Sequence, residues 1–169
     1  MHNLYLFRHG QTNENMSGVR YGAASRGYLS PLGILQATEL AQKLADKKLD
    51  VFITSPYHRA VHTAVIVGHN HSEAPIITDE RLCEATFYHT DNPTPNEAAE
   101  LNNVLLRVKA VLDDILKTNY ENIAIVSHGG ITRAILAVCG YKINDIENAD
   151  CFHLMGTNNN WQLINDISQ

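Results

Sequence analysis

Residues 3–10 read Asn-Leu-Tyr-Leu-Phe-Arg-His-Gly, so a short apolar run ends directly in the polar pair Arg8-His9. Two later stretches have the same form. Residues 51–59 read Val-Phe-Ile-Thr-Ser-Pro-Tyr-His-Arg, and residues 123–130 read Ile-Ala-Ile-Val-Ser-His-Gly-Gly. A short apolar run that stops at polar, Gly or Pro residues is typical of a buried β-strand. The sequence therefore predicts three buried strands that each end in chemically active side chains.

Strand and helix patterns alternate along the rest of the chain. A long loop is expected to about residue 30, and Ser55 with Pro56 has the character of a helix N-cap and first helical residue. This alternation favours an α/β fold, a three-layer α/β/α sandwich with a mostly parallel sheet. Helices are expected at 31–48, 56–68, 96–118 and 129–138, and further strands at 74–79, 151–155 and 161–164.

The chain length of 169 residues is typical of one domain, so we expect a single domain over residues 1–169. Residues 84–95 show no periodicity and contain Pro93 and Pro95. This predicts a small irregular cap over about residues 84–100.

The charge balance limits the class of partner. Lys and Arg total 13 against 18 Asp and Glu, a formal charge of −5, which disfavours a nucleic-acid partner held by general phosphate attraction. The three cysteines have no disulfide or zinc spacing, and no run is long enough for a membrane span. We therefore expect a cytoplasmic protein with no membrane partner; the sequence indicates no oligomeric state.

The three polar strand ends are expected to meet. Ligands bind beyond the carboxyl ends of the strands in an open parallel sheet. Arg8, His9, Arg59 and His128 would then share one pocket, where an anion is needed to offset their charge. A guanidinium binds phosphate through two parallel hydrogen bonds, and Gly129 at a helix start can add a backbone N–H. The predicted ligand is a small phosphorylated substrate or inorganic phosphate.

The same residues carry a family resemblance. Residues 8–12, Arg-His-Gly-Gln-Thr, with Asn15 after them, resemble the opening signature of the histidine phosphatase superfamily, the phosphoglycerate mutase-like family. Four later stretches are similar to the segments that follow in that family, in the same order: 29–37, 55–64, 82–84 and 127–130.

The resemblance implies a metal-independent phosphatase that needs no cofactor and works through a phosphohistidine. His9 would be the nucleophile and Glu84 the proton donor, while Arg8, Arg59 and His128 would hold the phosphoryl oxygens. The phosphate- or substrate-binding set is completed by a few residues of less specific character: Thr12, Asn15, Arg20 and Gly129.

Some features depart from the family pattern and leave alternatives open. Residues 85–91 replace a stretch that often contains Gly, Trp, Glu and Gly, which makes Asp91 a second candidate acid. The short chain favours hydrolysis over a phosphoglycerate mutase reaction. A protein phosphohistidine phosphatase and a non-catalytic phosphometabolite-binding module also remain, although binding alone needs no nucleophile or acid. His58 and His62 stand four residues apart but lack an HExxH motif, so a solvated helix face is favoured over a metal site.

Overall fold

The computed structural model describes residues 1–16, 27–85, 94–157 and 160–167. Its centre is a six-stranded sheet with the order β3-β2-β4-β1-β5-β6. The first four strands in that order are parallel, whereas β5 pairs antiparallel with both β1 and β6. The strands are β1 (His2–Arg8), β2 (Val51–Thr54), β3 (Ile76–Thr78), β4 (Asn122–Ser127), β5 (Cys151–Thr157) and β6 (Asn160–Asp166). The predicted mostly parallel sheet is confirmed.

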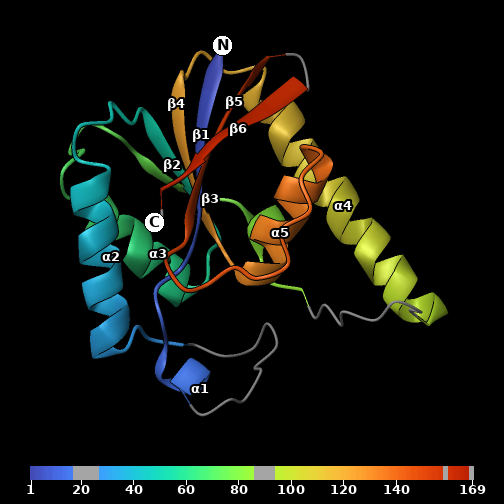
Figure 1. Ribbon diagram of the computed structural model, residues 1–169, viewed down its shortest axis with the longest axis horizontal. Helices are drawn as coiled ribbons and strands as arrows, with labels where there is room; N and C mark the ends of the chain where they lie inside the picture. Colours follow the sequence, from blue (N-terminus) through green and yellow to red (C-terminus); the bar gives the residue numbers. More distant parts are fainter. Residues whose placement is uncertain (17–26, 86–93, 158–159, 168–169) are drawn as a thin grey trace.

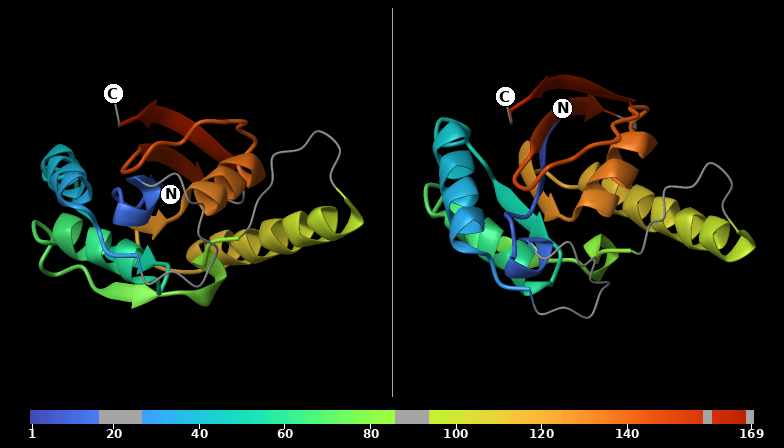
Figure 2. Two further views of the ribbon diagram at one scale, coloured as in Figure 1. Left: turned by 90° about the horizontal axis from the view of Figure 1, so that it is seen from below. Right: turned by 60° about the horizontal axis from the view of Figure 1, so that its bottom comes forward.

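Helices cover both faces of this sheet. In Figures 1 and 2, α2 (Pro31–Lys43) and α3 (His58–Gly68) lie on one side, and α4 (Pro95–Ile115) and α5 (Gly129–Val138) lie on the other. The short helix α1 (Asn13–Met16) lies at the end of the molecule to which β1 runs, the bottom of Figure 1. A short 3-10 helix, η1 (Glu80–Leu82), follows β3. The three-layer α/β/α arrangement is therefore confirmed.

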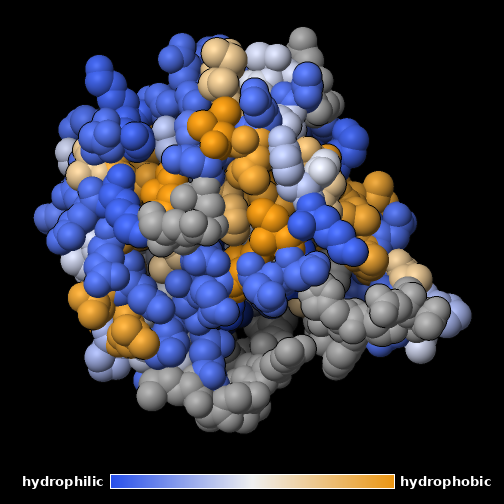
Figure 3. Space-filling view, in the orientation of Figure 1, coloured by the Kyte–Doolittle hydropathy of each residue, from blue (hydrophilic) through white to orange (hydrophobic). Residues whose placement is uncertain are grey.

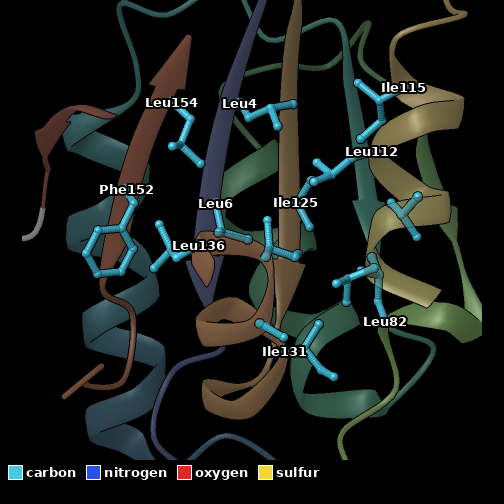
Figure 4. Packing of buried hydrophobic residues seen from close by; sticks show 14 of the residues in the cluster. Leu4, Leu6, Leu82, Leu112, Ile115, Ile125, Ile131, Leu136, Phe152 and Leu154 are labelled. Atoms are coloured by element: carbon cyan, nitrogen blue, oxygen red, sulfur yellow. The ribbon is translucent and has the colours of Figure 1, made fainter. Parts of the chain in front are cut away.

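The core lies in two layers because neighbouring strand residues point to opposite faces. Leu4 and Leu6 pack with Leu112 and Ile125 toward α4 and α5, as Figure 4 shows. Tyr5 and Phe7 belong to the layer under α2 and α3. Burying a side chain such as Leu contributes about 1.5–3 kcal/mol, so both layers help to fix the strands in register.

Polar residues dominate much of the surface in Figure 3, with apolar residues gathered near its middle. A smaller apolar area lies at the lower left, on the side of α2. Leu32 and Leu35 on α2 and the nearby residue Tyr28 are about half exposed.

Two close backbone approaches connect the first strand end to α2. A Cβ atom at Gly10 would collide with the Gly33 carbonyl oxygen, and one at Gly33 would collide with the Gln11 carbonyl oxygen. Ser30 caps α2 by accepting a hydrogen bond from the Gly33 backbone N–H at 3.1 Å. The loop after β1 is thus pressed against the first turn of α2.

Three details of the sequence prediction were wrong. Helix α3 begins at His58 after an N-cap at Tyr57, not at Pro56 after Ser55, because the backbone is still extended at Tyr57 (φ −68°, ψ 134°). The loop to residue 30 contains the unpredicted helix α1. Residues 95–100 of the expected irregular cap form the first turns of α4, because Thr94 and Glu97 make a capping box. Residues 86–93 of that cap lie outside the described residues.

Candidate active site

The register of the parallel strands brings three polar chain segments together. Arg8 at the end of β1 pairs with Ser127 of β4, and Thr54 of β2 pairs with Val126. The ladder continues one residue further, since the His9 and Ser55 backbone N–H groups donate to the Ser127 and Val126 carbonyls at 2.9 Å each. The segments that follow β1, β2 and β4 therefore start at the same level of the sheet, as their sequences predict.

His9 is held in one orientation and one tautomer. Its side chain is 3% exposed, and its Nδ1 lies 2.7 Å from the Gly10 carbonyl oxygen. A carbonyl only accepts, so Nδ1 carries the ring proton. Nε2 then has a lone pair, which accepts a hydrogen bond from Arg59 Nε at 3.0 Å. Burial, and then the charge of Arg59, hold the pKa of His9 well below its usual value of 6.5. His9 is thus a neutral imidazole with a fixed nucleophilic nitrogen.

Two guanidinium groups flank this imidazole. Arg59 comes from the first turn of α3, is 5% exposed, and lies with its guanidinium carbon 5.1 Å from the centre of the Tyr57 ring. Arg8 donates from its Nη1 atom to the Ile146 carbonyl at 2.7 Å. Burial lowers the pKa of both guanidinium groups, and the nearby Glu84 carboxyl opposes that shift. Both remain cations beside His9, in the place where an anion would be bound.

His128 is fully buried at the N-cap of α5, and its ring meets the His9 ring at an angle of 68° with 5.2 Å between centres. Its Nε2 lies 2.8 Å from Ser55 Oγ. Its Nδ1 is buried and has no hydrogen-bond partner among the described residues. Burial, followed by the nearby His9 and Arg59, keeps the pKa of His128 well below 6.5. His128 is therefore also neutral.

Glu84 follows η1 and is close enough to both arginines to interact with their charges. Its Oε1 accepts a hydrogen bond from the Ala85 backbone N–H at 3.1 Å. Burial raises the pKa of Glu84 above its usual value of 4.5, while the Ala85 hydrogen bond and the charges of Arg59 and Arg8 oppose the increase. This is the environment of a carboxyl group that can both give and take a proton. Asp91, the second candidate acid, lies outside the described residues.

The weaker candidates fall into three groups. Thr12 and Asn15 bind each other, because each backbone N–H donates to the other's side-chain oxygen at 3.1 and 3.2 Å. Gly129 begins α5, and a Cβ there would lie 3.5 Å from Arg8 Nε. Arg20 lies outside the described residues. The geometry thus gives Thr12 and Asn15 a mutual structural contact and places Gly129 against Arg8.

Sequence reasoning missed several residues that hold the site. Asn148 Nδ2 donates to the His9 carbonyl at 3.1 Å, and Thr63 Oγ1 accepts from the Gly10 backbone N–H at 3.1 Å while donating to the Arg59 carbonyl at 2.8 Å. Thr63 lies in the stretch 55–64, whose resemblance was noted, so a signal existed. The segment that supplies Ile146 and Asn148 has no periodicity and no motif, so no sequence signal could have identified them.

Together these residues supply a lone pair from His9, two guanidinium cations, an unpartnered ring nitrogen of His128 and the carboxyl group of Glu84. This combination suits the transfer of an anionic group better than the binding of a metal. Within the described residues, no cluster of three or more His, Cys, Asp or Glu side chains could hold a metal ion. His58 and His62 do share one face of α3, with ring centres 5.8 Å apart, but without further ligands. None of the helices in the described ranges is long and apolar enough to cross a membrane.

Comparisons with known proteins agree with this geometry. The family model for the histidine phosphatase superfamily (branch 1) matches residues 4–103 and 87–164. A putative phosphoserine phosphatase 2 of Hydrogenobacter thermophilus is 31% identical over 162 residues, which cover 82% of this chain and 78% of that protein.

Two solved structures share the fold. A phosphoglycerate mutase from Bacillus anthracis superposes with a TM-score of 0.82 at 19% identity, over 99% of this chain and 93% of that one. A phosphoserine phosphatase from Entamoeba histolytica in complex with 3-phosphoglyceric acid has a TM-score of 0.76 at 23% identity, over 98% and 96% of the two chains. Both likenesses show a shared architecture.

Proposed function

The chain belongs to the histidine phosphatase superfamily, and we propose that it hydrolyses small phosphomonoesters through a phosphohistidine formed on His9. The observation that carries this proposal is the state of His9. Its Nδ1 proton is held by the Gly10 carbonyl, and its Nε2 lone pair faces Arg59. A neutral, oriented imidazole between cations is what nucleophilic attack on a phosphate ester requires.

In the first step, the Arg59 Nε–H group transfers its hydrogen bond from His9 Nε2 to a phosphoryl oxygen, which releases the Nε2 lone pair. Nε2 then attacks phosphorus and forms the N–P bond while the bond from phosphorus to the ester oxygen breaks. Arg8, Arg59 and His128 stabilise the charge on the phosphoryl oxygens, which is the main source of catalysis in such reactions. Protonated Glu84 donates its proton to the leaving oxygen. The raised pKa of Glu84 favours this step, because it keeps more of the acid form available.

In the second step, ionised Glu84 accepts a proton from a water molecule whose oxygen attacks the phosphoryl group. The N–P bond breaks, and inorganic phosphate leaves with His9 neutral and Glu84 protonated again. Each proton that Glu84 gives in the first step therefore returns to it in the second. The side chains alone complete the cycle in this proposal, without a metal or an organic cofactor.

Small phosphorylated molecules are the proposed substrates. The formal charge of −5 disfavours polyanions, whereas the cations that matter are concentrated at the strand ends. The named phosphatase relative and the phosphoglyceric acid complex belong to proteins that handle small phosphate esters. We also propose that residues 1–169 act as one domain, as their number suggests. We propose that this domain is cytoplasmic, because its three cysteines have no disulfide or zinc spacing.

The test is a panel of phosphate esters with a free-phosphate readout. It contains p-nitrophenyl phosphate, phosphoserine, sugar phosphates, nucleotides and 3-phosphoglycerate, together with a phosphohistidine-bearing protein. We expect phosphate release from several small esters. Exchange of 2- and 3-phosphoglycerate with little free phosphate would instead identify a mutase. Binding of phosphate without turnover of any ester would identify a binding module, and turnover of the phosphoprotein alone a protein phosphohistidine phosphatase.

A further inference from the structure

Ser55 is positioned to control the tautomer of His128. Ser55 and His128 are both fully buried, and Ser55 Oγ lies 2.8 Å from His128 Nε2. Ser55 Oγ also accepts a hydrogen bond from the Tyr57 backbone N–H at 3.3 Å. Among the described residues, His128 Nε2 is the one acceptor within reach of the Ser55 hydroxyl proton. The hydroxyl therefore donates to Nε2.

A donor at Nε2 decides where the ring proton of His128 resides. Burial and the neighbouring charges keep His128 neutral, so its ring has one proton for two nitrogens. If Nε2 accepts from Ser55, that proton is on Nδ1. Nδ1 is the buried nitrogen that has no hydrogen-bond partner in the described part of the chain. The arrangement thus leaves an N–H donor unsatisfied beside His9, whose ring centre is 5.2 Å away.

We propose that Ser55 is a positioning residue whose hydroxyl donates to His128 Nε2 and so fixes the ring proton on Nδ1. The Nδ1–H group can then donate a hydrogen bond to a phosphoryl oxygen. This second statement rests on the proposed function. The two histidines then present opposite groups to one phosphate ester, a lone pair from His9 and an N–H from His128.

The first test uses the wild-type chain and needs no turnover. Histidine labelled with 15N gives chemical shifts that distinguish protonated from unprotonated ring nitrogens, and the spectrum of His128→Asn identifies the His128 signals. We expect protonated Nδ1 and unprotonated Nε2 near neutral pH, and a change in the Nδ1 shift on addition of inorganic phosphate. A proton on Nε2, or an Nδ1 shift that phosphate leaves unchanged, would overturn the proposal.

The second test measures kinetics with p-nitrophenyl phosphate. Ser55→Ala should lower kcat/KM about tenfold, by analogy with the removal of a group that orients a metal-bound histidine. Its His128 signals should show both tautomers, and Ser55→Thr, which retains the hydroxyl, should recover the Nδ1-protonated form and activity. Unchanged kcat/KM in a folded Ser55→Ala, or loss without a change of tautomer, would count against the proposal.

Ser127 provides a matched control. It is also a fully buried serine at a strand end, but its hydroxyl donates to the Leu82 carbonyl at 2.8 Å. Ser127→Ala should lower the melting temperature while keeping kcat/KM within about twofold and the His128 tautomer unchanged. If the wild type does not hydrolyse p-nitrophenyl phosphate or any ester of the panel, the proposed function fails. The labelled spectra still decide the tautomer.

Discussion

The two ends of the parallel strands differ in whether their polar groups have hydrogen-bond partners. At the amino end, Asp50 Oδ2 accepts hydrogen bonds from the Glu121 and Asn122 backbone N–H groups at 2.8 Å each, and Asn3 Nδ2 donates to Asn122 Oδ1 at 3.0 Å. At the carboxyl end, Arg8 Nε and His128 Nδ1 are buried and have no hydrogen-bond partner among the described residues. The polar groups of Asp50, Asn3 and Asn122 at the amino end are satisfied by one another and by the backbone, whereas Arg8 Nε and His128 Nδ1 at the carboxyl end are not.

This difference matters for a ligand. Leaving a buried donor without a partner costs about 1–3 kcal/mol, and an anion bound at the carboxyl end would satisfy both Arg8 Nε and His128 Nδ1. The sign of the charge also differs, because Asp50, Glu73 and Glu121 line a shallow pocket at the amino end. An acidic chain can therefore bind an anion at the carboxyl end of its sheet, where Arg8 and Arg59 lie, while a group of carboxylates lines a pocket at the other end.

The largest expected effect is that of His9→Ala at the carboxyl end. Loss of the nucleophile should reduce kcat/KM by about a thousandfold or more in the free-phosphate assay. Transfer of labelled phosphate to the protein should disappear as well. Circular dichroism should show that the fold is retained. Activity that persists in the folded variant would refute His9 as the nucleophile.

His153→Ala is the matched control for that variant. His153 stacks on Tyr5 with 4.6 Å between ring centres, and its Nε2 lies 3.0 Å from Asn3 Oδ1. It belongs to the same sheet but lies toward the amino end. Its removal should lower the stability of the chain and leave kcat/KM within about twofold of the wild type. An equal loss of activity in both variants would break the distinction between the two ends.

A smaller effect, with a characteristic pH dependence, is expected for Glu84→Gln. The proposed first step uses protonated Glu84, so kcat/KM should fall as the pH rises through the pKa of Glu84, which burial raises above 4.5. On the acidic side, activity should fall only as His9 becomes protonated, well below pH 6.5. In Glu84→Gln the alkaline decrease should vanish, and alkyl phosphates should slow by about a hundredfold.

The leaving group separates an acid role for Glu84 from a binding role. p-Nitrophenolate leaves without help from a proton, so p-nitrophenyl phosphate should be affected far less than an alkyl phosphate such as glycerol phosphate. Glu97→Gln is a suitable control, because Glu97 is used in the capping box of α4. An equal loss for both esters in Glu84→Gln would count against the acid role.

Much of the fold could be predicted from the sequence, because each of the three strands and its polar end is encoded by consecutive residues. The apolar runs before Arg8, Ser55 and Ser127 predicted the parallel strands, and the order of motifs predicted the family. The predicted start of α3 was wrong, because the backbone is still extended at Tyr57. The contact between Ser55 and His128, 73 residues away, was not predicted either. Propensity describes a residue and its neighbours, and it carries no information about so distant a partner.

Contacts between distant residues also limited how much of the candidate site could be predicted. Each residue of the candidate set was predicted because it stands in a recognisable stretch of sequence: Arg8, His9, Arg59, Glu84 and His128. The Ile146 carbonyl that accepts from Arg8 was not predicted, because every residue has a backbone carbonyl and the residue type does not show which one is used. Asn148, which holds the His9 carbonyl, lies in a segment without periodicity. Contacts of this kind depend on the path of the backbone and become visible only in the structure.

The smallest effect on activity is expected at the amino end, in Asp50→Ala. The variant loses the acceptor for the Glu121 and Asn122 backbone N–H groups, which should reduce the free energy of unfolding by about 1–2 kcal/mol. For a chain of this length that corresponds to a decrease in Tm of about 3–6 °C.

Glu73→Ala, which removes a neighbouring carboxylate of the same pocket, should change Tm far less. Asp50 and Glu73 lie at the end of the sheet opposite the candidate active site, so kcat/KM should stay within about twofold of the wild type in both variants. A loss of activity in Asp50→Ala at a temperature where the variant is folded would mean that the two ends are energetically coupled.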